Sequence, residues 1–149
     1  MHFSNLHKVT PFLWYQDQAE QAARFYVSIF PNSRIVDSSP MMATFELEGA
    51  QFIAFNGGPA QKLDHAISLF IRCKDQEEVD YYWNKLGAGG REVQCGWLVD
   101  QFGLSWQVVP EILGDLLGDD DRAKADRAMQ AMLKMVKLDI AALKKAHAG

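Results

Sequence analysis

The chain has 149 residues, 48% of them hydrophobic and 23% charged, and its formal net charge is −4. These values exclude a disordered or fibrous chain and are typical of a single globular domain spanning 1–149. No broad basic surface follows from this charge, so we expect no nucleic-acid partner. The apolar runs are far shorter than the roughly 20 residues of a membrane span, and the N-terminus lacks the features of a signal peptide. With two cysteines and no CxxC motif, a cytoplasmic protein without membrane contact is expected.

The first predicted strand covers residues 9–15, and a helix is predicted over 18–30. Apolar side chains in this helix recur at the i, i+3, i+4, i+7 spacing of one helical face. Asp17 stands where it can cap the start of the helix. Three short strands are predicted next, and their ranges are 34–37, 42–48 and 51–56.

The same order of elements returns 57 to 58 positions later. A strand over 66–73 precedes a helix over 75–86, which Asp75 can cap, and strands follow at 91–94, 97–99 and 104–109. The apolar helix positions match in pairs: Ala22 with Val79, Phe25 with Tyr82, Tyr26 with Trp83, and Ile29 with Leu86. We therefore predict an α+β fold of two tandem βαβββ modules, about 8–58 and 65–109, with a linker at about 57–64.

The remainder, about 110–147, is predicted to be helical. A short helix covers 110–117, the acidic run at 118–121 caps a longer helix that continues through 137, and Asp139 caps the last. Met129 and Met132 belong to an apolar stripe on the longer helix, which we expect to pack in the core or at an interface. Together with Phe30 and Trp83, this stripe presents more apolar surface than a small monomer needs to expose, so we expect a homodimer.

Strand alternation predicts a pocket. Leu13 and Ile71 must face the helices, which sends Trp14, Phe70 and Ser68 to the opposite side of their strands. The predicted ligand pocket comprises Phe12, Trp14, Asn56, Ser68, Phe70, Arg72, Cys95, Trp97 and Gln107, of which Asn56 and Gln107 are included because of the family resemblance described below. Arg72 can pair with an acid on a small-molecule ligand. The alternative is that the aromatic side chains fill the interior and Arg72 reaches solvent.

Several strings carry a resemblance to a known family: TPFLW at 10–14, AARFYVSIFPNS at 22–33, FNGGP at 55–59, CGWL at 95–98 and GLSWQVVP at 103–110. Together with the paired modules, they resemble the PhnB-like branch of the vicinal oxygen chelate (glyoxalase/bleomycin resistance/dioxygenase) superfamily. That branch also carries the label 3-demethylubiquinone-9 3-methyltransferase domain. The resemblance implies that each module curls into a half-barrel, that two modules enclose a pocket, and that first and fourth strands supply metal ligands.

The implied ligand positions hold no carboxylate and no imidazole. They fall on Thr10 or Pro11, on Ala54 or Asn56, on Ser68 and on Gln107. Hydroxyl and amide groups alone bind a hard divalent ion poorly, so we expect no metal and no cofactor. His65 is the nearby imidazole, and its position three residues before Ser68 predicts that it lies on the opposite face of the strand.

The residues do not identify a reaction. Class I methyltransferases need a glycine-rich turn between a strand and a helix, but Gly57-Gly58 leads to Pro59 and the run at 87–90 leaves a helix. Cys95 has no recognisable base nearby, which favours an unreactive thiol, and no catalytic residue is assigned. We favour a metal-free protein that binds an aromatic or apolar ligand. One alternative is an enzyme of the superfamily that uses this pocket, either a metal-dependent lyase or isomerase that recruits a metal partly through His65 or an enzyme without a metal. The other is an interaction protein with a filled interior.

Overall fold

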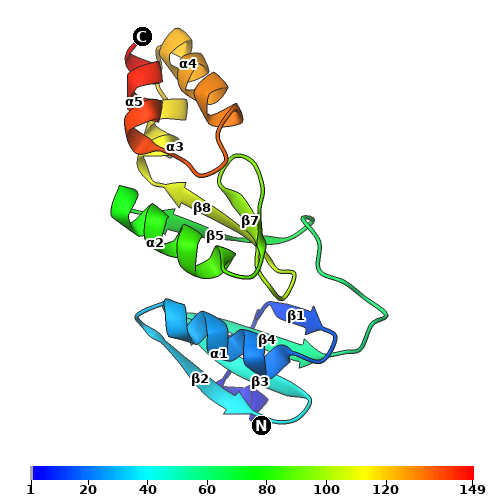
Figure 1. Ribbon diagram of the computed structural model, residues 1–149. Coiled ribbons are helices and arrows are strands. Elements are labelled where there is room, and N and C mark those ends of the chain that lie inside the picture. The colour runs from blue at the N-terminus through cyan, green and yellow to red at the C-terminus, as the bar shows by residue number, and fades with distance from the viewer. Residues whose placement is uncertain (1) are drawn as a thin grey trace. The chain divides into compact units, whose positions relative to one another are not determined.

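The computed structural model describes residues 2–149 and divides the chain into two compact units, with the boundary between Asp64 and His65 (Figure 1). Each unit contains one four-stranded mixed sheet and a helix that connects its first two strands. This arrangement confirms the predicted α+β class with two βαβββ modules followed by helices.

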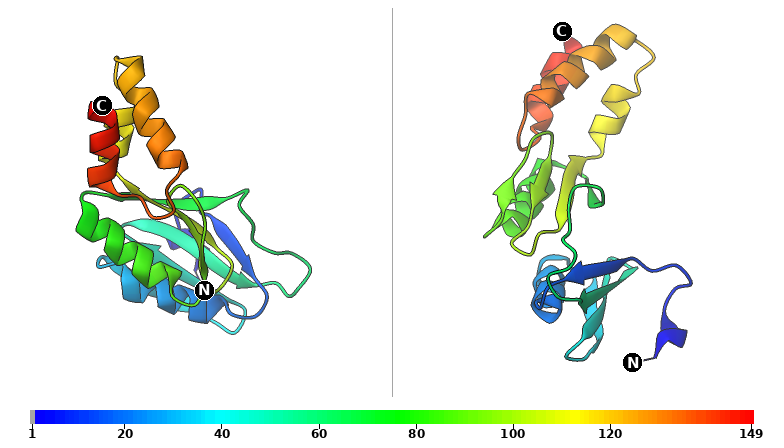
Figure 2. Two further views of the ribbon diagram at one scale, coloured as in Figure 1. Left: turned by 45° about the horizontal axis from the view of Figure 1, so that its top comes forward. Right: turned by 90° about the vertical axis from the view of Figure 1, so that its right-hand side faces the viewer.

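The first unit begins with a single 3-10 turn at Phe3–Asn5. Its elements are then β1 (Phe12–Tyr15), α1 (Ala19–Ile29), β2 (Ser33–Ser38), β3 (Met42–Leu47) and β4 (Ala50–Asn56). The strands lie in the order β1-β4-β3-β2, in which only β1 and β4 run parallel. Helix α1 covers one face of this sheet, as Figure 2 shows from two sides.

Alternating side chains of β1 bury one face of the first sheet. Leu13 and Tyr15 are buried beneath α1, whereas Phe12 is 52% exposed. The hydroxyl groups of Tyr15 and Tyr26 lie 2.9 Å apart and form a buried hydrogen bond between strand and helix. Of the predicted helical face, Ala22, Tyr26 and Ile29 are buried, whereas Phe25 is half-buried at its margin.

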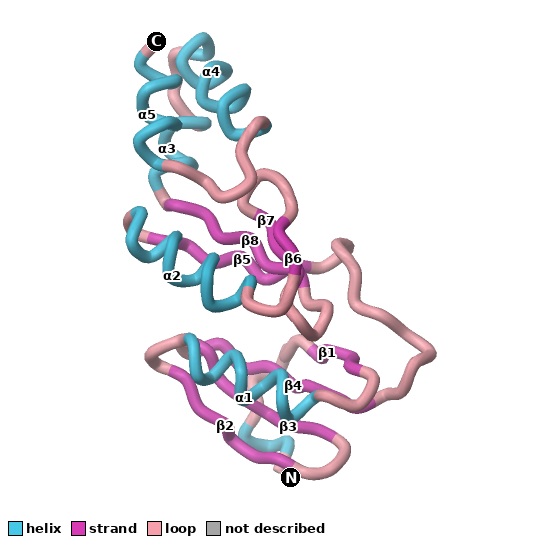
Figure 3. Tube along the Cα trace, viewed as in Figure 1, coloured by secondary structure: helices cyan, strands magenta, loops and turns pink. Residues whose placement is uncertain are grey.

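The second unit repeats this topology (Figure 3). Its elements are β5 (Ser68–Cys73), α2 (Gln76–Gly87), β6 (Arg91–Glu92), β7 (Trp97–Val99) and β8 (Ser105–Pro110). The strand order is β5-β8-β7-β6, again with only the first pair parallel. The apolar positions of α2 that match those of α1 are all buried: Val79, Tyr82, Trp83 and Leu86.

Three helices follow β8: α3 (Ile112–Leu117), α4 (Arg122–Leu133) and α5 (Ile140–Ala148). The predicted helix through 137 is too long, because the chain leaves α4 after Leu133 to meet the second sheet. There the carbonyls of Met135 and Val136 accept hydrogen bonds from the N–H groups of Cys95 and Gly96. Helices α3, α4 and α5 pack around a small core whose buried residues are Val109, Leu113, Leu116, Ala128, Leu138 and Leu143. Met132 packs against that core, whereas Met129 is 37% exposed.

Three of the four predicted caps are confirmed. In the acidic run, the Asp121 carboxylate accepts from the N–H groups of Ala123 and Lys124 in α4. The Asp75 carboxylate accepts from the N–H of Glu78 in α2, and the Asp139 carboxylate accepts from the N–H of Ala142 in α5. The prediction for Asp17 is wrong, because Gln18 is the N-cap of α1 and makes no side-chain cap bond.

Replacing Asp139 with alanine should destabilise α5. Loss of a capping carboxylate costs about 1 kcal/mol, and the exposed N–H of Ala142 then has only water as partner. Thermal unfolding followed by circular dichroism checks this, with Asp120→Ala as the control because Asp120 is exposed in the turn before α4. Equal melting temperatures for the two variants would contradict the capping role.

The exposure expected of Phe30 and Trp83 is wrong. Phe30 is buried in the first unit, and Trp83 is buried in the second, where its indole N–H donates to the Glu92 carboxylate at 3.0 Å. The homodimer therefore stays a prediction that these two residues no longer support. Within residues 2–149, each helix is too short or too polar to cross a membrane.

Candidate functional site

The second sheet has one face that α2 does not cover, here called the open face. Side chains of directly paired residues point to the same side of a sheet. Ser68 pairs with Ser105, and Phe70 and Trp97 both pair with Gln107, so all five lie on the open face. The covered face consists of buried apolar residues: Ile71, Leu98, Trp106 and Val108. Phe70 is 60% exposed, which presents an aromatic ring to whatever meets this face.

A hydrogen bond fixes the polar centre of the open face. Gln107 Nε2 donates to Ser68 Oγ at 3.0 Å, across the parallel pair of β5 and β8. The Gln107 amide oxygen has no bond to a described residue and can accept from a ligand. The structure thus brings four predicted pocket residues, Ser68, Phe70, Trp97 and Gln107, to one face of the second sheet, and their role in ligand binding stays a prediction.

His65 lies on the open face too, although we expected it on the opposite one. Its Nδ1 is 2.8 Å from Ser105 Oγ, and its ring meets that of Trp97 edge to face, with centroids 5.6 Å apart. The expectation failed because alternation holds only within a strand, and β5 begins at Ser68, after a turn that contains His65. The site thus gains an imidazole beside its aromatic and amide groups.

Two other predicted pocket residues in this unit have structural partners. Arg72 lies on the open face, but its Nη1 is 2.7 Å from a Glu111 carboxylate oxygen, so an ion pair already occupies it. Cys95 lies in the turn before β7 at a φ of 60° and is tied through its N–H to Met135. The other thiol, Cys73, is buried, and that burial raises its pKa to about 12, which excludes a reactive thiolate at neutral pH.

The first sheet has an open face of its own, with an aromatic cluster. The Phe55 ring lies 5.1 Å from that of Phe12 and 5.3 Å from that of Trp14. The Trp14 indole N–H donates to the carbonyl of Gly58 at 2.9 Å. Phe55 was not among the predicted pocket residues, because the register that sets Trp14 opposite Phe55 is visible only in the structure.

Asn56 does not share the face of Trp14, so its placement in the pocket is a correction. It pairs with Tyr15, which is buried under α1, and its side chain reaches the start of that helix. Its Oδ1 accepts from the N–H of Ala19 at 2.8 Å, and its Nδ2 donates to the carbonyl of Pro40. Asn56 thus supplies the cap that we expected from Asp17. The further prediction that Trp14 and Gln107 line one cavity stays a prediction, since they belong to different units.

The donor groups of the open faces do not fit a divalent metal. Among residues 2–149, no three His, Cys, Asp or Glu side chains gather closely enough to hold one. Glu46, on the open face of the first sheet, is bonded by Gln51 and Arg34, and these hydrogen bonds keep its pKa below the ordinary value. Ser68 and Gln107 are neutral donors that bond each other, and Ala54 has no side-chain donor. Neutral hydroxyl and amide groups are poor substitutes for the anionic ligands that hard cations prefer.

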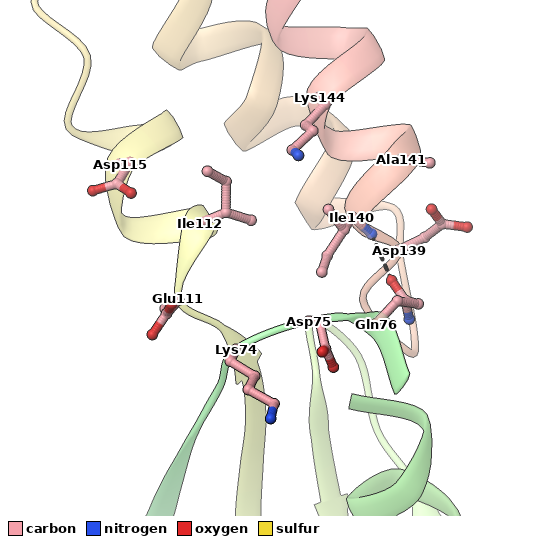
Figure 4. Close-up of a pocket in the computed structure, with 10 residues that line it drawn as sticks. All are labelled: Lys74, Asp75, Gln76, Glu111, Ile112, Asp115, Asp139, Ile140, Ala141 and Lys144. Atoms are coloured by element: carbon pink, nitrogen blue, oxygen red, sulfur yellow. Dashed lines mark hydrogen bonds between the residues drawn. The ribbon is translucent and has the colours of Figure 1, made fainter. Parts of the chain in front are cut away.

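A groove of about 710 Å³ lies elsewhere in the second unit, between the start of α2 and helices α3 and α5 (Figure 4). Its walls include Ile112 and Ile140, and its rim is mostly charged. Three of its acids are already engaged, because Asp75 and Asp139 cap helices and Glu111 pairs with Arg72. This groove was not predictable from the sequence, since it depends on how the starts of α2, α3 and α5 meet. Since three of its four acids support the fold, we take the open face of the second sheet as the stronger site.

A protein-family model described as 3-demethylubiquinone-9 3-methyltransferase matches residues 7–109. None of the curated proteins matches the chain. Among solved structures, the PhnB protein from Bacillus cereus is 30% identical with a TM-score of 0.64, and the match covers 70% of this chain and 99% of that one.

More distant structures share the fold alone. Protein PA1353 from Pseudomonas aeruginosa is 17% identical with a TM-score of 0.58, and the match covers 71% of this chain and 98% of that one. The fosfomycin resistance protein FosX from Listeria monocytogenes, solved with Mn(II) and sulfate ion, is 21% identical with a TM-score of 0.54. That match covers 79% of this chain and 95% of FosX.

Proposed function

The chain belongs to the 3-demethylubiquinone-9 3-methyltransferase family, the PhnB-like branch of the vicinal oxygen chelate superfamily. Within this family, we propose that it is a metal-free protein that binds a small aromatic or apolar molecule. The ligand lies against the open face of the second sheet. Phe70 and Trp97 provide aromatic contact, and the amide of Gln107 orients one polar group of the ligand.

The exposure of Phe70 beside a hydrogen-bonded polar pair is the observation that carries this proposal. A large aromatic side chain that is 60% exposed loses the free energy of burial unless something covers it. Small-molecule sites combine such apolar surface with a few fixed polar groups. Gln107 is fixed by Ser68 and retains an acceptor for the ligand.

The family's methyltransferase label finds no support in the two glycine runs. The indole of Trp14 lies where a side chain at position 57 would begin, so Gly57 serves the packing of Trp14. The other run, from Gly87 to Gly90, ends α2 and leads into β6. Neither forms the turn between strand and helix that cradles a cofactor in class I methyltransferases.

Ligand binding should depend on Phe70 and Gln107. With 2-naphthamide as a neutral aromatic probe, Gln107→Ala should weaken binding by about 1–3 kcal/mol through the lost hydrogen bond, and Phe70→Ala should weaken it through lost aromatic contact. Isothermal titration calorimetry in the presence of a chelator measures both. Phe3→Ala is the matched control, because Phe3 is also 60% exposed but lies in the N-terminal turn. Equal affinities for all three variants would contradict the proposed site.

A further inference from the structure

The charge on the open face of the second sheet is one-sided. Among the paired strand residues on this face, Arg72 and Arg91 are the charged ones. No Asp or Glu lies on this face in the described strands β5 to β8. Glu92 pairs with Leu98 and bonds Trp83, so it belongs to the other face. Since Arg72 is engaged by Glu111, the guanidinium of Arg91 is the remaining permanent cation of these strands.

His65 adds a second group that can be cationic. Its Nδ1 is held by Ser105 and its ring by Trp97, which fixes the imidazole beside the aromatic part of the site. Among the described residues no polar group bonds its Nε2, so that nitrogen is left for a ligand. A histidine ordinarily changes charge between pH 5 and 8, and it donates from both nitrogens once it is protonated.

We infer that the ligand of this face is an aromatic anion, such as an aryl carboxylate, whose ring lies against Phe70 and Trp97 and whose anionic group accepts a hydrogen bond from Nε2 of His65. This inference rests on the proposed function and names its ligand class. Arg91 pairs with Val99, which in turn pairs with Ser105, so these three residues lie side by side across the sheet. Arg91 therefore adds positive charge at the edge of the site. Asp64, immediately before His65, is the neighbouring acid along the chain.

The inference predicts a specific pH dependence. Protonation of His65 adds a positive charge, so an anionic ligand binds more tightly at low pH, whereas a neutral ligand of the same shape does not respond. A partly exposed ion pair of this kind changes affinity by about fivefold. Because Ser105 can donate to or accept from Nδ1, the ring stays in place in both charge states.

The test compares 2-naphthoate with 2-naphthamide by calorimetry at about pH 5.5 and about pH 8, a range in which the carboxylate stays ionised and histidine changes charge. For the wild-type chain, naphthoate should bind about fivefold more tightly at the lower pH, and naphthamide equally at both. His65→Gln should abolish the difference, and His2→Gln, at an exposed histidine near the N-terminus, should preserve it.

The outcomes separate the two proposals. If each probe binds, and the affinity of neither probe changes between the two pH values, the inference about His65 is overturned while the binding function stands. Naphthoate binding that keeps its pH dependence in His65→Gln would also overturn it. If neither probe binds, the proposed function fails, and the inference fails with it.

Discussion

Replacing Asp100 with alanine should lower the free energy of unfolding by about 3–5 kcal/mol, the largest effect we expect from a single substitution of a polar residue. Asp100 is buried in the hairpin between β7 and β8. Its Oδ1 accepts from the N–H groups of Phe102 and Leu104, and its Oδ2 accepts from the indole N–H of Trp106 at 2.9 Å. Alanine leaves these three donors without their acceptor, and a buried unsatisfied donor costs about 1–3 kcal/mol.

Chemical denaturation measures this loss, and two further variants interpret it. Asp100→Asn keeps one oxygen for the backbone donors but presents an amide N–H group to Trp106, so it should lie between wild type and Asp100→Ala. Asp120→Ala, at an exposed aspartate, should leave stability unchanged within about 0.5 kcal/mol. A loss below about 1 kcal/mol for Asp100→Ala would show that the hairpin does not depend on these bonds.

Replacing Gly57 with alanine should displace Trp14 and destabilise the first unit. A Cβ atom at position 57 would lie 2.1 Å from Cε2 of the Trp14 indole, which no real contact tolerates. The indole must therefore move, which breaks its hydrogen bond to the carbonyl of Gly58 and its edge contact with Phe55. Overpacking of this kind costs about 1–3 kcal/mol.

Denaturation and tryptophan fluorescence should both respond to Gly57→Ala, because the indole changes its surroundings. Gly114→Ala is the matched control: Gly114 lies in α3, a Cβ there meets nothing within 4 Å, and alanine favours helix. This control should be neutral or stabilising by up to about 1 kcal/mol. Wild-type stability and an unchanged emission spectrum in Gly57→Ala would contradict the packing described for Trp14.

The fold was predictable because two signals in the sequence agree. The helix spacing of Tyr26 and Tyr82 and the strand alternation of Leu13 and Ile71 together fix which face of each sheet is buried, and all four side chains are buried there. The repeat then relates the two modules, so evidence from one supports the other. The end of α4 was not predictable from spacing, because the contacts of residues 135 and 136 with the turn at Cys95 are tertiary.

The site was predictable only where it lies within strands. Alternation predicts that Ser68 and Phe70 share one face, and the family resemblance adds Gln107, and the structure pairs these residues on the open face because each belongs to a regular strand. Alternation fails for His65, which a turn brings to the open face. It also fails for Asn56, because the register between β1 and β4 decides its face and the sequence alone does not reveal that register. Ion pairs between distant residues, such as Arg72 with Glu111, are equally invisible in the sequence.

The most direct test of the central claim is a nuclear magnetic resonance titration of the isotope-labelled chain with 2-naphthoate in the presence of a chelator. We expect the side-chain amide of Gln107 and the indole N–H of Trp97 to shift as the ligand binds, with the indole of the buried Trp106 far less affected. Shifts confined to the groove residues around Ile112 and Ile140, or no shifts at all, would contradict a metal-free ligand site on the open face of the second sheet.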